Sequence, residues 1–204
     1  MRAPWRDGAY PQIATGAAGA PASIVKESDE FMPSTPPAYP ERDRNAEGRP
    51  ENARPRDRFG APLPRDALDE MAHAEEPDDV VASTAEALER AISLWDEERF
   101  FEAHEFLEFI WKHADVDPAD REFWKGVTQV AVGCCHTQRG NTAGSVTLLE
   151  RAAGYLDGYP DTHHGIDRQV LAGAAIDLAG RVRVEGASPD LGFPRFPRAG
   201  AVAS

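Results

Sequence analysis

The residues best suited to chemistry gather in one short stretch, Phe100–Lys112, with the sequence FFEAHEFLEFIWK. No Gly or Pro interrupts this stretch, so it is predicted to be a helix. His104, Glu108 and Trp111 then share one face because they are four and then three residues apart, and Glu105 flanks that face. Surface helices usually keep polar residues away from their apolar stripe, whereas here the polar residues lie within it. That conflict indicates either a buried polar network or a functional site.

A second anomaly follows in the stretch FWKGVTQVAVGCCHTQRGN. Gly126, Gly133 and Gly140 recur every seven residues, and Gln129 and His136 lie on the same line of the predicted helix. A glycine inside a helix costs about 1 kcal/mol relative to alanine, so this pattern predicts the close approach of another helix. The preceding helix is the natural partner, and we expect a polar seam between the two. The polar seam consists of His104, Glu105, Glu108, Trp111, Gln129, His136 and Asn141.

Two roles are open for the polar seam. In the first, the protein is a binding or structural module, and the seam is a hydrogen-bonded network that fixes helix packing. In the second, the protein is a hydrolase-like or mononuclear metal-binding enzyme that uses the same residues. The first role is favoured because no complete catalytic motif is present. The candidate catalytic residues are Glu105, Glu108, His104 and His136, and the candidate metal ligands are His104, Glu108 and His136.

The spacing of these residues argues against two familiar metal motifs. A dinuclear bundle site needs Glu-x-x-His on two helices, but Gly133 stands where a carboxylate should precede His136. Zinc proteases carry His-Glu-x-x-His, and here Glu108 replaces the second histidine. No cofactor is predicted. If the second role is correct, the protein would bind a single divalent metal.

The elements that position these residues are predicted to be helices, because no strand signal competes with the helical periodicity in 84–186. The fold class is therefore all-α, a compact bundle of about five mostly antiparallel helices. A capping box at Ser83 and Glu86 opens the first helix, and Gly140 ends the third. The predicted helices cover about 84–97, 100–112, 118–139, 142–157 and 166–184. The first two are joined by a tight connection at 98–99 or are nearly continuous.

The segments outside the helices are predicted to be less regular. Residues 1–78 form a disordered, Pro-rich acidic tail, since 12 of the 17 prolines lie at or before Pro77; a short helix around 66–74 is left open. The bundle domain covers 79–196, and 197–204 is a disordered C-terminus. Leu191, Phe193 and Phe196 are expected to strap the C-terminal segment across the bundle. His163 and His164 fall in a turn and are interpreted as a solvated pair.

Composition narrows the classes of function. The chain is acidic, with a net charge of −13 at pH 7, so binding to nucleic acid through phosphate contacts is not expected. No apolar run is long enough to cross a bilayer and no signal peptide opens the chain, so the protein is expected in the cytoplasm, without a membrane role. The adjacent Cys134 and Cys135 are interpreted as buried thiols rather than a disulfide. The expected partner is another protein or a second copy of this chain.

Phe100–Lys112, together with the stretch FWKGVTQVAVGCCHTQRGNTAGSVTLLERAAGYLDGYP, resembles a family of small all-helical bacterial proteins, the domain-of-unknown-function 309 family. The resemblance covers about 90–190. It implies a compact helical fold that contains the polar seam, and it leaves the activity open because the family has none assigned. The matching residues are Phe101, Glu102, His104, Glu105, Glu108, Trp111, Gln129, Ala131, His136, Gly140, Asn141, Gly144 and Leu149, followed by Phe193 and Pro194.

Overall fold

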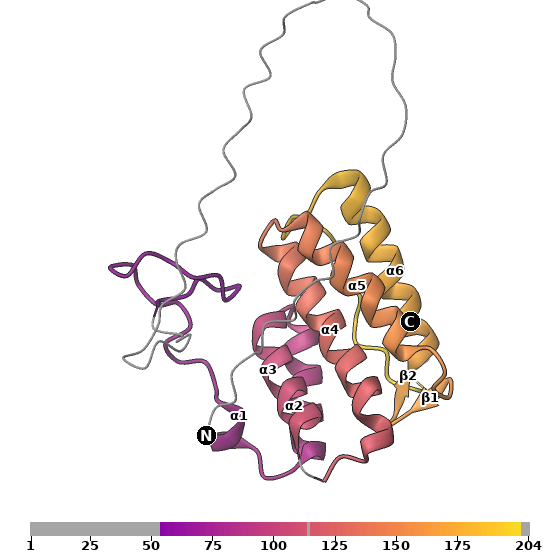
Figure 1. The fold of residues 1–204 in the computed structure, drawn as a ribbon. Coiled ribbons are helices and arrows are strands. Elements are labelled where there is room, and N and C mark those ends of the chain that lie inside the picture. Colours follow the sequence, from indigo (N-terminus) through magenta and orange to yellow (C-terminus); the bar gives the residue numbers. More distant parts are fainter. Residues whose placement is uncertain (1–53, 114, 201–204) are drawn as a thin grey trace, which may run out of the picture. The chain divides into compact units, whose positions relative to one another are not determined.

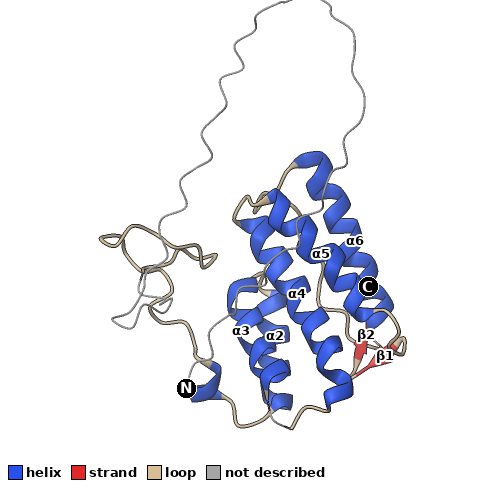
Figure 2. Cartoon of the chain, viewed as in Figure 1, coloured by secondary structure: helices blue, strands red, loops and turns tan. Residues whose placement is uncertain are grey.

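The computed structural model describes residues 54–113 and 115–200, and the predicted tail residues 1–53 lie outside this part (Figure 1). Five helices of more than ten residues dominate the described chain, with a single small pair of strands (Figure 2). The all-α prediction is therefore confirmed. The helices are α1 (Pro77–Val80), α2 (Thr84–Asp96), α3 (Phe100–Lys112), α4 (Arg121–Gln138), α5 (Thr142–Leu156) and α6 (Arg168–Glu185), and a 3₁₀ turn, η1 (Pro118–Asp120), precedes α4.

Local signals set the ends of these helices. The Ser83 hydroxyl accepts the amide of Glu86, so the predicted cap at Ser83 is present. The Glu86 carboxylate reaches back as in a capping box, but it accepts the amide of Ala82, one residue before the cap. Gly140 ends α4 in the left-handed region, with a φ of 71°. Asn141 then caps α5, because its Oδ1 accepts the Gly144 amide at 2.9 Å.

Each long helix packs mainly on its neighbours in sequence, and large aromatic side chains fill the core. The Trp95 indole is fully buried and donates to the Pro194 carbonyl at 2.8 Å, so the C-terminal segment is held against α2. Phe196 packs edge-on against Trp95 with centroids 5.3 Å apart, and Phe193 lies 5.0 Å from Phe100. The predicted strapping of this segment by Phe193 and Phe196 is present.

The glycines of α4 face α5, not α3. A Cβ at Gly133 would lie 2.7 Å from the side chain of Leu149, and one at Gly126 would lie 3.1 Å from Leu156. Both leucines belong to α5 and are fully buried. The prediction that these glycines line the contact with the preceding helix is therefore wrong. The close approach itself exists, but the helix that follows makes it.

Two alternatives left open by the sequence are decided by the structure, and one element is new. The predicted tight connection at 98–99 separates α2 from α3, since Glu98 adopts a left-handed φ of 59° that turns the chain back. Strands β1 (Thr162–His163) and β2 (Ile166–Asp167) form a hairpin where no strand was predicted. His164 and Gly165 both have positive φ, the conformation of a tight two-residue hairpin turn. The stretch 66–74 forms turns rather than a helix.

The described part of the predicted tail contacts the bundle. The Phe59 carbonyl accepts Arg139 Nε at 2.8 Å and lies 3.4 Å from Cys135 Sγ, both on α4. A Cβ at Gly60 would overlap the Phe101 ring, so this backbone lies directly on α3. Contact with the bundle thus begins earlier in the chain than the boundary predicted at residue 78. At the other end, Ala199 donates to the Gly165 carbonyl, past the boundary predicted at 196.

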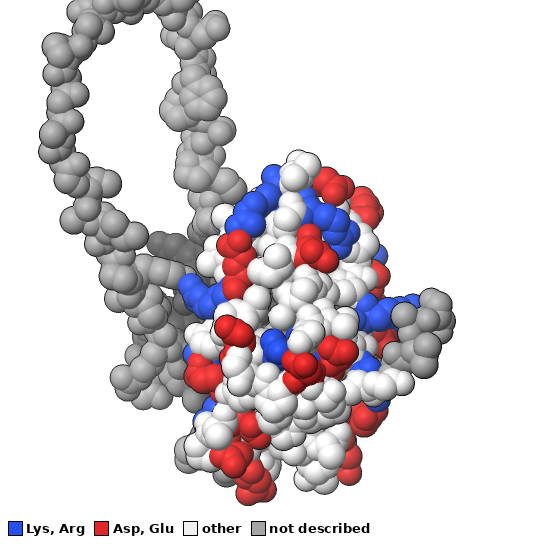
Figure 3. Space-filling model, turned by 90° about the vertical axis from the view of Figure 1, so that its right-hand side faces the viewer, with Lys and Arg blue, Asp and Glu red and all other residues white. Residues whose placement is uncertain are grey.

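The remaining expectations concern the surface and the thiols. Cys134 and Cys135 are buried free thiols. Figure 3 shows acidic and basic side chains interspersed on one face of the bundle, without a continuous basic patch on that face. None of the helices in the described ranges combines the length and the hydropathy that a membrane crossing requires.

Candidate functional site

Three potential ligands from α3 converge on one point, and we call them the α3 cluster: His104, Glu105 and Glu108. One ligand atom from each lies within 4.8 Å of the others. His104 Nε2 is 3.3 Å from a Glu105 carboxylate oxygen, and Lys112 pairs with the Glu108 carboxylate. Glu108 is buried, whereas the Glu105 side chain is 42% exposed, so the cluster runs from the protein interior to solvent.

The tautomer of His104 follows from its backbone partner. Its Nδ1 contacts the Phe101 carbonyl, which can only accept a hydrogen bond, so Nδ1 carries the proton. A neutral His104 therefore directs the lone pair of Nε2 toward Glu105. Burial lowers the pKa of His104 to about 4, against the opposing effects of the Phe101 carbonyl and Glu108. The ring is thus neutral at physiological pH.

Glu105 is shifted in the opposite direction. Burial of the carboxylate, and then the nearby charges of Glu108 and Glu76, raise its pKa to about 7. A protonated Glu105 can donate to His104 Nε2, so the two groups suit each other as a proton donor and acceptor. Pairs of groups whose pKa values are driven apart in this way are common at functional sites.

Two guanidinium groups lie beside the cluster. Arg56 and Arg139 both lie over the Phe101 ring, with their central carbons 5.2 and 5.3 Å from its centroid. Burial, and then the like charge of Arg139, lower the pKa of Arg56. This pair could not be predicted from the sequence, because Arg56 falls in the predicted tail and no local pattern connects it with α4.

His136 and Asn141 form a separate pair at the junction of α4 and α5. Asn141 Oδ1 is committed to the Gly144 amide, so its Nδ2 must donate to His136 Nδ1, 2.8 Å away. Burial, and then the charges of Arg139 and His104, lower the pKa of His136. Its Nε2 carries the proton when the ring is neutral, because Nδ1 accepts from Asn141. A Cβ at Gly144 would collide with this ring, which places His136 against the first turn of α5.

The remaining seam residues, Gln129 and Trp111, lie outside the α3 cluster. Gln129 Oε1 is buried and accepts no hydrogen bond from any described residue. Trp111 packs partly buried against the core. Within the described residues, the hydrogen bonds and ion pairs of His104, Glu105 and Glu108 all stay on α3. The structure therefore brings three of the seven seam residues together in one cluster and pairs two others elsewhere.

Asn141 gives a direct test of the second pair. Asn141→Ala is expected to destabilise the fold by about 1 kcal/mol, because it removes both the cap of α5 and the partner of His136. Asn141→Asp keeps the capping oxygen but places a carboxylate beside His136. It should retain most of the stability while raising the pKa of His136, which NMR titration of the histidine ring measures. An unchanged pKa in Asn141→Asp would show that the two side chains are not in contact.

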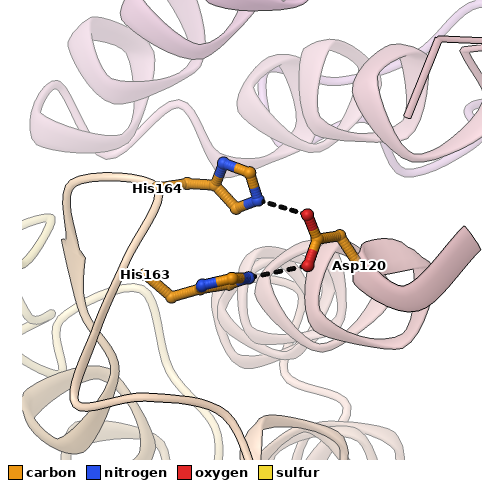
Figure 4. A group of neighbouring side chains, drawn as sticks. All are labelled: Asp120, His163 and His164. Carbon is orange, nitrogen blue, oxygen red and sulfur yellow. Dashed lines mark hydrogen bonds and ion pairs between the residues drawn. The ribbon is translucent and has the colours of Figure 1, made fainter. Parts of the chain in front are cut away.

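A second group of potential ligands lies at the other end of α4, and we call it the histidine–aspartate cluster: Asp120, His163 and His164. The Nε2 atoms of the two histidines lie 2.8 Å from the two different carboxylate oxygens of Asp120. Figure 4 shows both rings reaching from the hairpin toward this one side chain. Burial raises the pKa of Asp120, but its hydrogen bonds with the histidines outweigh this and hold the pKa below its usual value. The interpretation of His163 and His164 as a solvated pair is wrong, since both are engaged across 43 or 44 residues of chain.

Comparison with known proteins bears on the first of these sites. Residues 88–148 match the model of a family described as a domain of unknown function (DUF309). The predicted resemblance to this family is confirmed. The matched residues include all of α3 and α4, and hence the α3 cluster, His136 and Asn141. The match ends before Phe193 and Pro194, so it is shorter than the 90–190 expected from the sequence.

One relative is similar over a short stretch of the chain. An uncharacterised protein of Bacillus subtilis (strain 168), YpuF, is 42% identical over 50 residues, which is 24% of this chain and 28% of the relative. The similar segment thus spans less than a third of that protein. Neither the description of the family nor that of the relative names an activity.

Proposed function

We propose that the protein binds one divalent cation at the α3 cluster. The observation that carries the proposal is the geometry of this cluster. One nitrogen and two carboxylate ligand atoms lie within 4.8 Å of one another. The Phe101 carbonyl holds the Nδ1 proton of His104, so the Nε2 lone pair is directed at the same point. Metal-binding histidines characteristically donate their second N–H to a carbonyl or carboxylate in this way.

The chemistry of the ligands favours a particular class of cation. Two carboxylates and one imidazole suit an oxygen-preferring divalent ion such as Mn²⁺ better than a thiolate-preferring one. Lys112 at present neutralises Glu108, and a cation bound there would replace the positive charge of this half-exposed side chain. Three protein ligands leave coordination positions for water, and a bound cation activates such water. The hydrolase-like alternative is therefore an extension of the same proposal.

The other role, a network that fixes helix packing, has less support at these residues. The polar contacts that join different elements come from other side chains. Gln138 Nε2 donates to the Glu98 carbonyl at 2.8 Å, and the Thr137 and Ser145 hydroxyls are 2.6 Å apart between α4 and α5. The side chains of the α3 cluster are bonded to atoms of their own helix. Polar contacts between the helices are thus made by side chains outside the α3 cluster, and this favours a ligand-binding role for the cluster.

Mn²⁺ titration of the metal-free, untagged full-length protein, followed by calorimetry and by electron paramagnetic resonance, tests the proposal. We expect one Mn²⁺ per chain. Glu105→Gln and Glu108→Gln should each weaken binding at least tenfold, about 1.4 kcal/mol, because an amide is a poorer ligand than a carboxylate. The control is Glu122→Gln, an exposed residue of α4 that pairs with Lys125. Equal affinities for the control and the two cluster variants would refute the proposal.

A further inference from the structure

We infer that the histidine–aspartate cluster is a second metal site, one that takes a single Zn²⁺ or a similar imidazole-preferring divalent ion. Its donor set is two imidazole nitrogens and one carboxylate, all within 4.8 Å. This set differs from that of the α3 cluster, where carboxylates outnumber imidazole. Imidazole-rich sets favour zinc and its neighbours in the transition series, so the two sites should differ in the metal they prefer.

The backbone of the hairpin explains how two consecutive residues reach the same carboxylate. Successive side chains on a strand point to opposite faces, so adjacent histidines would normally diverge. Here β1 ends at His163, and His164 begins the turn with a left-handed φ of 49°. A non-glycine residue seldom adopts this conformation, and at His164 it accompanies the contact of both rings with Asp120.

Aromatic side chains hold the two imidazoles in place. His163 packs edge-on against Phe123 at 4.7 Å, and His164 lies 4.9 Å from Trp124. Tyr159 lies 5.4 Å from His163, and its hydroxyl donates to the Ala119 carbonyl at 2.7 Å. The hairpin is therefore tied to η1 next to Asp120. Because these contacts already restrict both imidazole rings, less side-chain entropy is lost when a metal binds.

The spacing of the ligand atoms is close to that of a zinc site. Zinc bonds to nitrogen and oxygen are about 2.0 to 2.1 Å long in a tetrahedral arrangement, which places ligand atoms about 3.3 Å apart. Atoms that now lie within 4.8 Å reach this spacing through shifts of about 1 Å in each side chain. Neutral rings bind through Nε2 once the proton sits on Nδ1. The His164 side chain is 37% exposed, so a fourth position faces solvent and can hold water.

Zinc titration of the metal-free full-length protein tests this site separately from the α3 cluster. The variants are Asp120→Asn and His164→Asn. Asn tolerates the left-handed backbone at 164, and the Asp120 side chain makes no capping hydrogen bond to α4, so both variants should keep the fold. We expect at least 100-fold weaker Zn²⁺ binding at this site in both, with wild-type affinity in His113→Asn. Circular dichroism confirms that each variant is folded.

A second measurement does not depend on any variant. Co²⁺ bound to the wild-type protein should give the visible absorption of a four- or five-coordinate site, and NMR should show metal-dependent shifts at Nε2 of both His163 and His164. Zn²⁺ affinity equal to wild type in both cluster variants would mean that the three residues form an ion-pair clamp only. Metal-dependent shifts at His104 but at neither His163 nor His164 would place the metal at α3 alone. Either result overturns the inference.

Discussion

Gly133→Leu is expected to destabilise the protein by about 3 kcal/mol or more, through the contact between α4 and α5. A side chain at 133 begins with a Cβ only 2.7 Å from the Cγ and Cδ2 atoms of Leu149. Leu149 is fully buried and has little room to move. Gly133→Ala should also be destabilising, by about 1 to 2 kcal/mol, because this overlap exceeds the gain of about 1 kcal/mol that alanine brings to a helix.

The matched control lies on the other helix of the same pair. Gly154 is inside α5, and a Cβ there would meet nothing within 4 Å. Gly154→Ala should therefore stabilise the protein by up to about 1 kcal/mol. Denaturant unfolding of the three variants measures these differences. A destabilising Gly154→Ala, or a tolerated Gly133→Leu, would contradict the assignment of the glycine contact to α5.

Opposite pH dependences are expected from the two titrating partners of the α3 cluster. The folded pKa of His104 is lowered to about 4. Its contribution to stability is therefore complete above the unfolded pKa of about 6.5 and is lost as the pH falls toward 4. The full loss is about 3 kcal/mol, since 1 pKa unit corresponds to about 1.4 kcal/mol. The folded pKa of Glu105 is raised to about 7, so its contribution is complete below about 4.5 and is lost as the pH rises toward 7.

The two effects oppose each other between pH 4.5 and 6.5, and variants separate them. Relative to wild type, Glu105→Gln should gain stability as the pH rises through this window, whereas His104→Gln should lose it. The change in Glu105→Gln should be the smaller, because solvent screens a side chain that is 42% exposed. Unfolding free energies across pH 4 to 7.5 measure both differences. Subtracting the wild-type value from that of each variant removes the contributions of titrating groups that all three proteins share. Slopes of the same sign would show that the two groups do not titrate as the geometry of the cluster requires.

The elements of the fold could be predicted from the sequence because their signals are local. The Ser83 cap, the Asp117-Pro118 start and the Gly140 terminator all act within one helical turn. The core of the candidate site was also predictable for this reason. His104 and Glu108 are four residues apart on one uninterrupted helix, so the helix alone places them on the same face.

Relations between distant residues could not be predicted in this way. The glycine spacing in α4 predicts a close approach, but the helix has two neighbours in the chain and the spacing does not distinguish them. The Asp120 contacts with His163 and His164 span more than 40 residues, so no local pattern in the sequence connects the three side chains. The one available signal was His164-Gly165, a dipeptide suited to a tight turn with two positive φ values.

A crystal of the full-length protein grown with Mn²⁺, with data collected at the manganese absorption edge, shows whether the α3 cluster binds a cation. We expect one anomalous peak bound by His104 Nε2 and by the carboxylates of Glu105 and Glu108, with Lys112 turned away from Glu108. We also expect this peak to disappear in Glu105→Gln. An α3 cluster that stays free of Mn²⁺ at millimolar concentration, with the Lys112–Glu108 pair intact, would contradict the proposal.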